Sequence, residues 1–186
     1  MARKPTLHVF CGKLASGKTT LAGQVAKKAN AVLVSEDAWL ATLFPGEITS
    51  FADYLDRSAY FRKAIAPHII RLLQNGTSVV FDFGGNTLKE RAWVRSLCKP
   101  YEARIVLHYV KASDEFCKRQ LQERNEELPI GTQPTSDAEF DEITKFFMPP
   151  ESAEKFEIVE YSRKEEKITR VSHPNRYPLA KRRGNK

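Results

Sequence analysis

A glycine-rich segment near the N-terminus has the residue types needed to bind phosphate groups. Residues 12–19 read GKLASGKT and match the pattern G-x-x-x-x-G-K-[ST] in full. In such a loop the backbone N–H groups turn toward phosphate oxygens, and the following helix adds the partial positive charge of its N-terminus. Lys18 supplies an ammonium group for the terminal phosphate, and the Thr19 hydroxyl can bind magnesium. A glycine-rich turn without a ligand is the alternative, but the complete pattern favours a nucleoside triphosphate site.

The flanking residues put this segment, called the phosphate loop below, between a strand and a helix. An apolar run at residues 7–11 precedes it, and apolar residues recur at helical spacing over residues 20–29. This is the context in which the pattern binds nucleotides, so we expect ATP and Mg²⁺ as cofactors. The residues expected to contact the nucleotide are Gly12, Leu14, Ala15, Ser16, Gly17, Lys18, Thr19 and Thr20.

Two aspartates follow strand-like apolar runs further along the chain. Asp37 comes after residues 31–34 and could accept the proton of a hydroxyl group aligned with the terminal phosphate. A helix N-cap or first-turn acid is an equally good interpretation of Asp37, and one residue can do both. Asp82 lies near the end of the run at residues 78–83. We expect it to bind magnesium together with Thr19, although a strand-ending turn residue would give the same pattern.

For other side chains close to these aspartates in the sequence, a functional role is less strongly indicated. Asn86 could point into the same cleft, whereas Glu36 and Arg91 are interpreted as solvated helix residues. The segment from residue 39 to 60 is rich in aromatic residues, most of which we expect in the core. A few of them could line an acceptor pocket beside the candidate base.

Arg119 and Arg124 are candidate lid arginines. In that role they would spread positive charge over the transferring phosphoryl group and contact the nucleotide. Their spacing of five residues separates them by about 140° on an ideal helix, so both reach one site only if the helix ends near Arg124. An exposed helix face with charges of alternating sign is the alternative interpretation.

Strand-like and helix-like segments alternate along the chain, which predicts an α/β fold with right-handed crossovers. We expect about five mostly parallel strands with helices on both faces, in three layers. Ligands of such sheets bind at the carboxyl ends of the strands, where Asp37 and Asp82 would lie beside the phosphate loop. The expected strands cover residues 7–11, 31–34, 78–83, 103–110 and 156–161. The expected helices cover residues 20–29, 38–44, 51–74 (as one or two helices), 88–98, 114–126 and 137–147.

The charge of the chain is concentrated at its C-terminus. Residues 162–186 hold nine Lys/Arg and two Glu, which equals the whole formal net charge of +7. We therefore divide the chain into a neutral domain at residues 1–161 and a basic, flexible tail at residues 162–186. The tail is either a solvated end or an electrostatic tether to nucleic acid or an anionic surface.

Composition and cysteine content favour an ordinary cytoplasmic protein. The 186 residues are 41% hydrophobic and 28% charged, as in a single globular domain. No apolar stretch is long enough to cross a membrane, and the basic N-terminus is not followed by the apolar core of a signal peptide. The three cysteines are widely spaced and match neither a disulfide framework nor a metal site.

Taken together, these motifs resemble the small P-loop kinase group, which includes chloramphenicol phosphotransferase, zeta toxins, gluconate kinase and the kinase domain of polynucleotide kinase. The resemblance rests on the phosphate loop, Ser-Glu-Asp at residues 35–37, Val-Val-Phe-Asp at residues 79–82 with the later Arg91, and Arg119 with Arg124-Asn125. It covers roughly residues 6–161, and the segment from Arg124 to Pro150 is similar to a bacterial subgroup of uncharacterised ATP-binding members.

The resemblance implies Asp37 as general base, Arg119 and Arg124 as lid arginines, and Lys18 and Thr19 as ligands of the γ-phosphate and magnesium. The Asp-x-x-Arg pattern of polynucleotide kinases is absent, because residues 38–40 read Ala-Trp-Leu. In that group the arginine helps to hold the phosphate of the acceptor, so its absence weakens the case for a nucleic-acid acceptor.

The expected function is therefore an ATP-dependent kinase that phosphorylates a hydroxyl group of a small molecule, such as an antibiotic or a metabolite. One alternative is a nucleic-acid 5′-hydroxyl kinase, motivated by the basic tail. Another is a nucleotide-dependent switch or binding protein with only slow hydrolysis. A toxin kinase that acts on a nucleotide sugar is a further variant of the first hypothesis.

Overall fold

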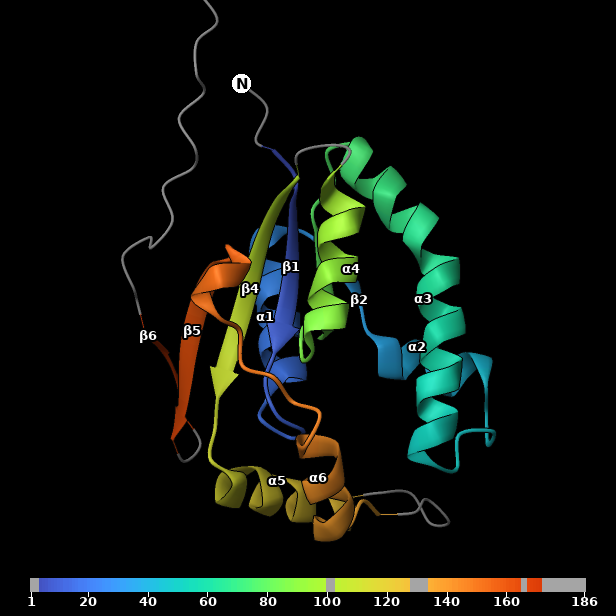
Figure 1. Ribbon diagram of the computed structural model, residues 1–186, viewed down its shortest axis with the longest axis vertical. Helices are drawn as coiled ribbons and strands as arrows, with labels where there is room; N and C mark the ends of the chain where they lie inside the picture. Colours follow the sequence, from blue (N-terminus) through green and yellow to red (C-terminus); the bar gives the residue numbers. More distant parts are fainter. Residues whose placement is uncertain (1–3, 100–102, 128–133, 165–166, 172–186) are drawn as a thin grey trace, which may run out of the picture.

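A six-stranded sheet runs through the centre of the protein (Figure 1). The computed structural model describes residues 4–99, 103–127, 134–164 and 167–171. The strands lie in the order β2-β3-β1-β4-β5-β6, and all neighbours are parallel except β5 and β6. They are β1 (Thr6–Cys11), β2 (Val32–Val34), β3 (Val79–Gly84), β4 (Arg104–Lys111), β5 (Glu157–Lys164) and β6 (Lys167–Val171).

Helices cover both faces of this sheet, which confirms the predicted three-layer α/β fold (Figure 1). Alternate residues of the strands point to opposite faces. In β1, Phe10 packs against α1, whereas Val9 belongs to the cluster that includes α3 and α4. The helices are α1 (Lys18–Ala29), α2 (Glu36–Leu43), α3 (Phe51–Gln74), α4 (Leu88–Cys98), α5 (Asp114–Glu126) and α6 (Asp137–Thr144), with a 3₁₀ turn at Ser152–Glu154.

Most helix boundaries follow the capping signals in the sequence. The capping boxes that begin at Thr87 and Ser136 are both formed. The segment from residue 51 to 74 is one helix of 24 residues, although it contains Pro67. Helix α2 begins at Glu36 rather than at residue 38, which puts Asp37 inside its first turn. Helix α6 ends at Thr144, three residues earlier than predicted.

The sheet continues further toward the C-terminus than the sequence indicates. We expected the ordered domain to end at residue 161, but β5 extends to Lys164 and β6 pairs with it, with Tyr161 opposite Arg170. Strand β6 reads KITRV and lacks the apolar run that marks the predicted strands, and it forms because the edge of β5 offers unpaired backbone groups. The rest of the predicted tail, residues 172–186, lies outside the described residues.

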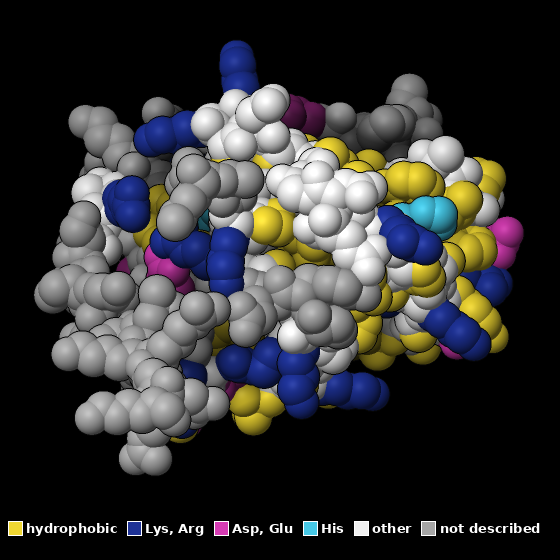
Figure 2. All heavy atoms as spheres, turned by 90° about the horizontal axis from the view of Figure 1, so that it is seen from above, with side chains coloured by type: hydrophobic (Ala, Val, Ile, Leu, Met, Phe, Trp, Pro, Cys, Tyr) yellow, Lys and Arg dark blue, Asp and Glu magenta, His cyan; other side chains and the backbone are white. Residues whose placement is uncertain are grey.

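The carboxyl ends of the parallel strands, α5 and α6 lie toward one end of the molecule, at the bottom of Figure 1. Figure 2 views the opposite end, where Lys and Arg side chains are dispersed among hydrophobic ones rather than gathered in one track. Among the described residues, no helix combines the length and apolar character that a bilayer span requires.

Candidate active site

The phosphate loop connects β1 to α1 and has backbone geometry that only certain residues tolerate. A Cβ atom on Gly12 would lie 2.7 Å from Oγ of Ser16 and 2.8 Å from the carbonyl oxygen of Val110, so a side chain does not fit there. Gly17, at the N-cap of α1, has a positive φ of 91°. Ala15 also lies in the left-handed region, at φ 57°, which is uncommon for a residue with a side chain. The loop is therefore held in a tight, strained turn of the kind found at functional sites.

The side chain of Lys18 folds back onto the backbone of this turn. Its Nζ donates hydrogen bonds to the carbonyl oxygens of Gly12, at 2.8 Å, and Lys13, at 2.7 Å. Burial lowers the pKa of Lys18, and the nearby Asp82 carboxylate partly counteracts that effect. Anionic phosphate oxygens would supply the counter-charge that two neutral carbonyl groups do not, so the ammonium group is poised for a phosphate ligand.

Asp82 on β3 has the surroundings of a metal ligand. Its Oδ2 accepts a long hydrogen bond of 3.4 Å from Ser35, whereas its Oδ1 is buried and has no hydrogen-bond partner. Burial raises the pKa of Asp82, the neighbouring Thr19 hydroxyl lowers it, and the Asp37 carboxylate raises it. An orphaned carboxylate oxygen beside a threonine hydroxyl fits Mg²⁺, which uses few protein ligands and completes its shell with water and phosphate oxygens. Among the described residues, no group of three or more His, Cys, Asp or Glu could hold a metal ion.

Asp37 lies at the same edge of the sheet, in the first turn of α2. It is exposed, and its charge acts on both Lys18 and Asp82, so the carboxylate is close to the phosphate loop. The hydroxyl of Tyr54 lies 3.4 Å from its Oδ1. The structure thus brings together Lys18, Thr19, Asp37 and Asp82, and it leaves Asp37 open to a hydroxyl group that arrives from solvent.

The two candidate lid arginines lie on α5, which packs against the phosphate loop. Phe116, Cys117 and Leu121 of this helix form a cluster with Leu14 and Ala15. An ion pair between Lys13 and Asp114 joins the loop to the first turn of the helix.

Arg119 and Arg124 themselves are exposed. The guanidinium of Arg119 lies 5.3 Å from the ring of Phe116 and 4.0 Å from Glu123. Among the contacts of the described residues, neither arginine touches Lys18 or Asp37. The lid function therefore stays a prediction for both.

One further cation approaches this helix from β5. The guanidinium of Arg163 lies 5.2 Å from the ring of Phe116, which Arg119 also contacts, and its Nε is buried without a hydrogen-bond partner. The sequence predicts that Arg163 belongs to the basic tail, but the extension of β5 to Lys164 puts it in the sheet. No local sequence signal distinguishes it from the other tail cations.

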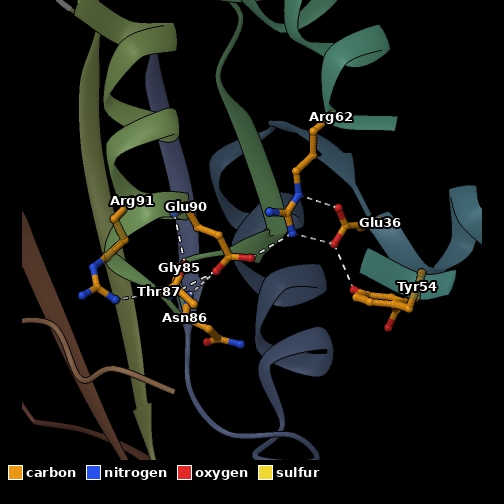
Figure 3. Close-up of polar contacts among 9 residues, drawn as sticks. Glu36, Tyr54, Arg62, Gly85, Asn86, Thr87, Glu90 and Arg91 are labelled. Carbon is orange, nitrogen blue, oxygen red and sulfur yellow. Dashed lines mark hydrogen bonds and ion pairs between the residues drawn. The ribbon is translucent and has the colours of Figure 1, made fainter. Parts of the chain in front are cut away.

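Glu36, the residue before Asp37, belongs to a buried ion network that the sequence did not predict (Figure 3). Glu36 was expected in solvent, but it is only 1% exposed. Arg62 donates to its two carboxylate oxygens from Nε, at 2.8 Å, and from Nη2, at 3.1 Å. The hydroxyl of Tyr54 donates to Glu36 at 2.9 Å, and Nη2 of Arg62 also reaches Glu90 at 2.9 Å. The network joins α2, α3 and α4.

The same network extends to the first residue of the phosphate loop. Glu90 accepts hydrogen bonds from the backbone N–H groups of Asn86 and Thr87, and Oδ1 of Asn86 accepts one from the N–H of Gly12 at 2.9 Å. A Cβ atom on Gly85 would lie 2.2 Å from the carbonyl oxygen of Phe10, so this turn packs directly on the end of β1. Asn86 does point toward the phosphate loop, where it fixes the backbone.

Arg91 is likewise a structural residue rather than a solvated one. It is 1% exposed, and its Nε and Nη2 bind the carboxylate of Glu154 at 2.6 and 2.8 Å. Its Nη1 donates to the carbonyl oxygens of Gly85 and Met148. The side chain thereby ties the segment after α6 to the turn after β3.

The sheet order, the phosphate loop and the carboxylates at the strand ends together define the small P-loop kinase fold. A candidate kinase from Chloroflexus aurantiacus J-10-fl has a TM-score of 0.69 and 18% identity over 86% of this chain and 89% of that chain. A chain of the Pnkp1/Rnl/Hen1 RNA repair complex has a TM-score of 0.62 and 21% identity over 78% of this chain and 44% of that chain. APS kinase CysC of Mycobacterium tuberculosis, in complex with AMPPNP and APS, has a TM-score of 0.57 and 16% identity over 86% of this chain and 88% of that chain.

The chain belongs to the AAA domain family, whose sequence pattern matches residues 7–150. The match includes the phosphate loop, both candidate carboxylates and all of α5. No curated protein matches the sequence.

Proposed function

We propose that this protein is a kinase that transfers the γ-phosphoryl group of ATP to a hydroxyl group of a small molecule. The observation behind this proposal is the grouping of Lys18, Thr19 and Asp82 around one end of the sheet, with Asp37 exposed beside them. A protein that only binds nucleotide needs the first three residues. An accessible carboxylate beside the phosphate site adds what a transfer reaction requires.

Each residue has a distinct task in the proposed reaction. Lys18 exchanges the carbonyl oxygens of Gly12 and Lys13 for phosphate oxygens, and the loop N–H groups hold the remaining oxygens. Thr19 and Asp82 would hold Mg²⁺, which neutralises charge on the β- and γ-phosphates when bound. Asp37 orients the acceptor hydroxyl and accepts its proton as the new bond to phosphorus forms.

Residues of α5 and β5 would contact the rest of the nucleotide. Arg119 and Arg163 lie on the ring of Phe116, next to the loop that α5 supports. Arg119 and Arg124 are within the helix that would close over the phosphates, where a guanidinium spreads charge from the transferring group. The similar structures from Chloroflexus aurantiacus and Mycobacterium tuberculosis are described as kinases, which supports phosphoryl transfer over simple nucleotide binding.

A nucleic-acid 5′-hydroxyl kinase is the second candidate, because a similar fold occurs in the RNA repair complex. Leu40 occupies the arginine position of the Asp-x-x-Arg pattern, which argues against a nucleic-acid kinase. Leu40 is 2% exposed and belongs to the main core cluster, so no cation is available there for an acceptor phosphate. A small-molecule acceptor is therefore favoured.

The free, buried cysteines Cys11, Cys98 and Cys117 support a reducing compartment such as the cytoplasm.

The substitution Asp37→Asn tests the assignment of the base. We expect phosphoryl transfer to fall by about 10²–10⁴-fold, because the amide cannot accept the proton. Nucleotide affinity should change little, since Asp37 is outside the phosphate loop. A mass-spectrometric screen of hydroxylated metabolites and antibiotics with ATP identifies the acceptor, and calorimetry with AMPPNP measures binding. Full activity of the variant would show that Asp37 is not the base.

A further inference from the structure

Three aromatic rings form a continuous row that begins at Asp37. The hydroxyl of Tyr54 is 3.4 Å from Oδ1 of this aspartate. The ring of Phe51, one turn earlier in α3, is stacked with that of Tyr54, with 6.4 Å between centroids and 9° between planes. Phe146, which follows α6, adds a third ring whose centroid is 5.8 Å from that of Phe51. The aromatic row therefore joins the candidate base to α3 and to the segment after α6.

The far end of the aromatic row is open, although its rings are apolar. Phe51 is 37% exposed, Phe146 is 59% exposed, and the nearby Met148 is 44% exposed. The backbone N–H of Met148 donates to the carbonyl oxygen of Asn86 at 2.8 Å, and Asn86 holds Gly12. Phe146 and Met148 thus lie on a segment anchored beside the phosphate loop, whereas Phe51 lies in α3. Sites for small molecules are typically lined by aromatic and apolar side chains with a few polar groups, and Asp37 with Tyr54 would be those groups here.

The arginines next to the aromatic row are already neutralised. Arg57 pairs with Glu47 at 2.9 Å and lies over the ring of Phe44. Arg62 is occupied by two carboxylates, Glu36 and Glu90. On the described turns of α3 around Tyr54, no guanidinium is left to bind a carboxylate, sulfate or phosphate of an acceptor. At this end of the row Asp37 contacts Tyr54, and its negative charge would repel an anionic acceptor.

We propose that the acceptor is an uncharged alcohol with an aromatic or similarly flat apolar part, which lies against Phe51, Tyr54 and Phe146 with its hydroxyl group at Asp37. The acceptor role rests on the proposed kinase function, whereas binding to the aromatic row does not depend on transfer. In the reaction the acceptor oxygen bonds to the γ-phosphorus while the bond from phosphorus to the β,γ-bridging oxygen breaks. The hydroxyl proton goes to Asp37, and the products are a phosphate monoester and ADP.

Ligand-observed NMR on the full chain with AMPPNP and Mg²⁺ tests this proposal with matched probes. 2-Phenylethanol and 2-naphthalenemethanol are the uncharged aromatic alcohols, 4-(hydroxymethyl)benzoate adds a negative charge, and glycerol lacks a ring. We expect the two aromatic alcohols to bind about tenfold or more tightly than the carboxylate and glycerol. Phe51→Ala and Phe146→Ala should each weaken this binding by about five- to tenfold.

Tyr60→Ala is the matched control, because Tyr60 is an aromatic residue of the same helix, is 60% exposed and lies outside the aromatic row. It should leave probe binding unchanged. If Phe51→Ala lowers the melting temperature, Phe51→Leu keeps an apolar side chain and still removes the ring. Preferred binding of the carboxylate or glycerol, absence of binding by both aromatic alcohols, or unchanged binding in the Phe51 and Phe146 variants would each overturn the proposal.

The same measurements separate this inference from the proposed function. Binding of the aromatic alcohols at the aromatic row, with no ATP-dependent phosphorylation of any hydroxyl compound, would remove the kinase and keep the binding site. Phosphorylation of an anionic acceptor that proceeds equally in Phe51→Ala and Phe146→Ala would keep the kinase and remove the inference.

Discussion

Asp37 and Asp82 are the same residue type at neighbouring strand ends, yet their surroundings give them different chemistry. Asp37 is exposed in the first turn of a helix and close to a tyrosine hydroxyl, so it can exchange protons with an incoming molecule. Asp82 has a buried oxygen without a partner, and burial raises its pKa. A carboxylate that is costly to ionise in the free protein gains most from a cation, which suits a metal ligand.

Asp82→Asn should therefore stabilise the free protein and weaken nucleotide binding. Because the folded-state pKa is raised, the folded state favours protonated Asp82, and this contribution to stability is lost as the pH rises through that pKa. At neutral pH the ionised carboxylate is a net cost, which the neutral amide removes. We expect a gain of about 0.5–2 kcal/mol in the free energy of unfolding.

Thermal unfolding with and without ATP and Mg²⁺ measures both effects of Asp82→Asn. The magnesium-dependent increase in melting temperature should shrink, with nucleotide affinity lowered by about tenfold or more. Asp56→Asn, at an exposed position of α3, is the control. A variant that is less stable than the native protein, or that keeps its full response to magnesium, would contradict the assignment.

The site residues that could be predicted from the sequence are those that belong to a short motif or directly follow an apolar run. Lys18 and Thr19 follow from the phosphate loop, and Asp37 and Asp82 follow from the rule that strand ends meet at one edge. Glu36 and Arg91 were interpreted wrongly as solvated, because the burial of a charge depends on partners that are distant in sequence. Arg62 is 26 residues from Glu36, and Glu154 is 63 residues from Arg91. No local pattern contains such pairs.

At the scale of elements, the buried ion network makes α2, α3 and α4 a single support for the site. Glu36 in α2, Arg62 in α3 and Glu90 in α4 contact one another, and Glu90 holds the turn that fixes the phosphate loop. The helices themselves could be predicted from capping signals and apolar spacing. Their mutual position could not, because it depends on these ion pairs and on close backbone contacts such as that of Gly85 with Phe10.

Arg62→Ala should destabilise the protein strongly, because it leaves Glu36 buried without a counter-charge. We expect a loss of about 3–5 kcal/mol in the free energy of unfolding, measured by urea denaturation. The double variant Glu36→Gln with Arg62→Met should lose less than Arg62→Ala alone, since the uncompensated charge is gone. Equal losses in these two variants would argue against a coupled network.

Arg57→Ala provides the matched control on the same helix. Arg57 pairs with Glu47 near the surface, where their side chains are 34% and 51% exposed, so its removal should cost less than about 1 kcal/mol. A cost similar to that of Arg62→Ala would mean that burial of the pair is not the deciding factor.

At the scale of the whole molecule, the proposed site and the last described strand, β6, occupy different parts of the sheet. The site lies at the carboxyl ends of β1 and β3, whereas the chain leaves the described region at β6, the edge strand furthest from β2. The parallel pairing of β1 to β5 could be anticipated from the alternation of strands and helices, whereas the strand order, with β1 between β3 and β4, was not predicted. The antiparallel strand β6 could not be predicted, because its residues form a strand only by pairing with the edge of β5.

The position of β6 changes how the role of the basic tail must be tested. Residues 172–186 hold five Lys/Arg and no Asp or Glu, whereas residues 162–164 and 167–171 belong to the sheet. A truncation after residue 171 removes only the basic segment, and a truncation after residue 161 also removes β6 and part of β5.

If the tail is an electrostatic tether, the truncation after residue 171 should abolish the binding of single-stranded oligonucleotides and lower the slope of log K against log salt by about 3–4. Phosphorylation of a small-molecule acceptor should be unchanged, because no residue of the proposed site is lost. Fluorescence anisotropy at several salt concentrations and an activity assay measure the two properties, and a charge-neutral replacement of the five basic residues by Ser is the control. Retention of oligonucleotide binding after this truncation would assign the binding to the folded domain and revive the nucleic-acid kinase.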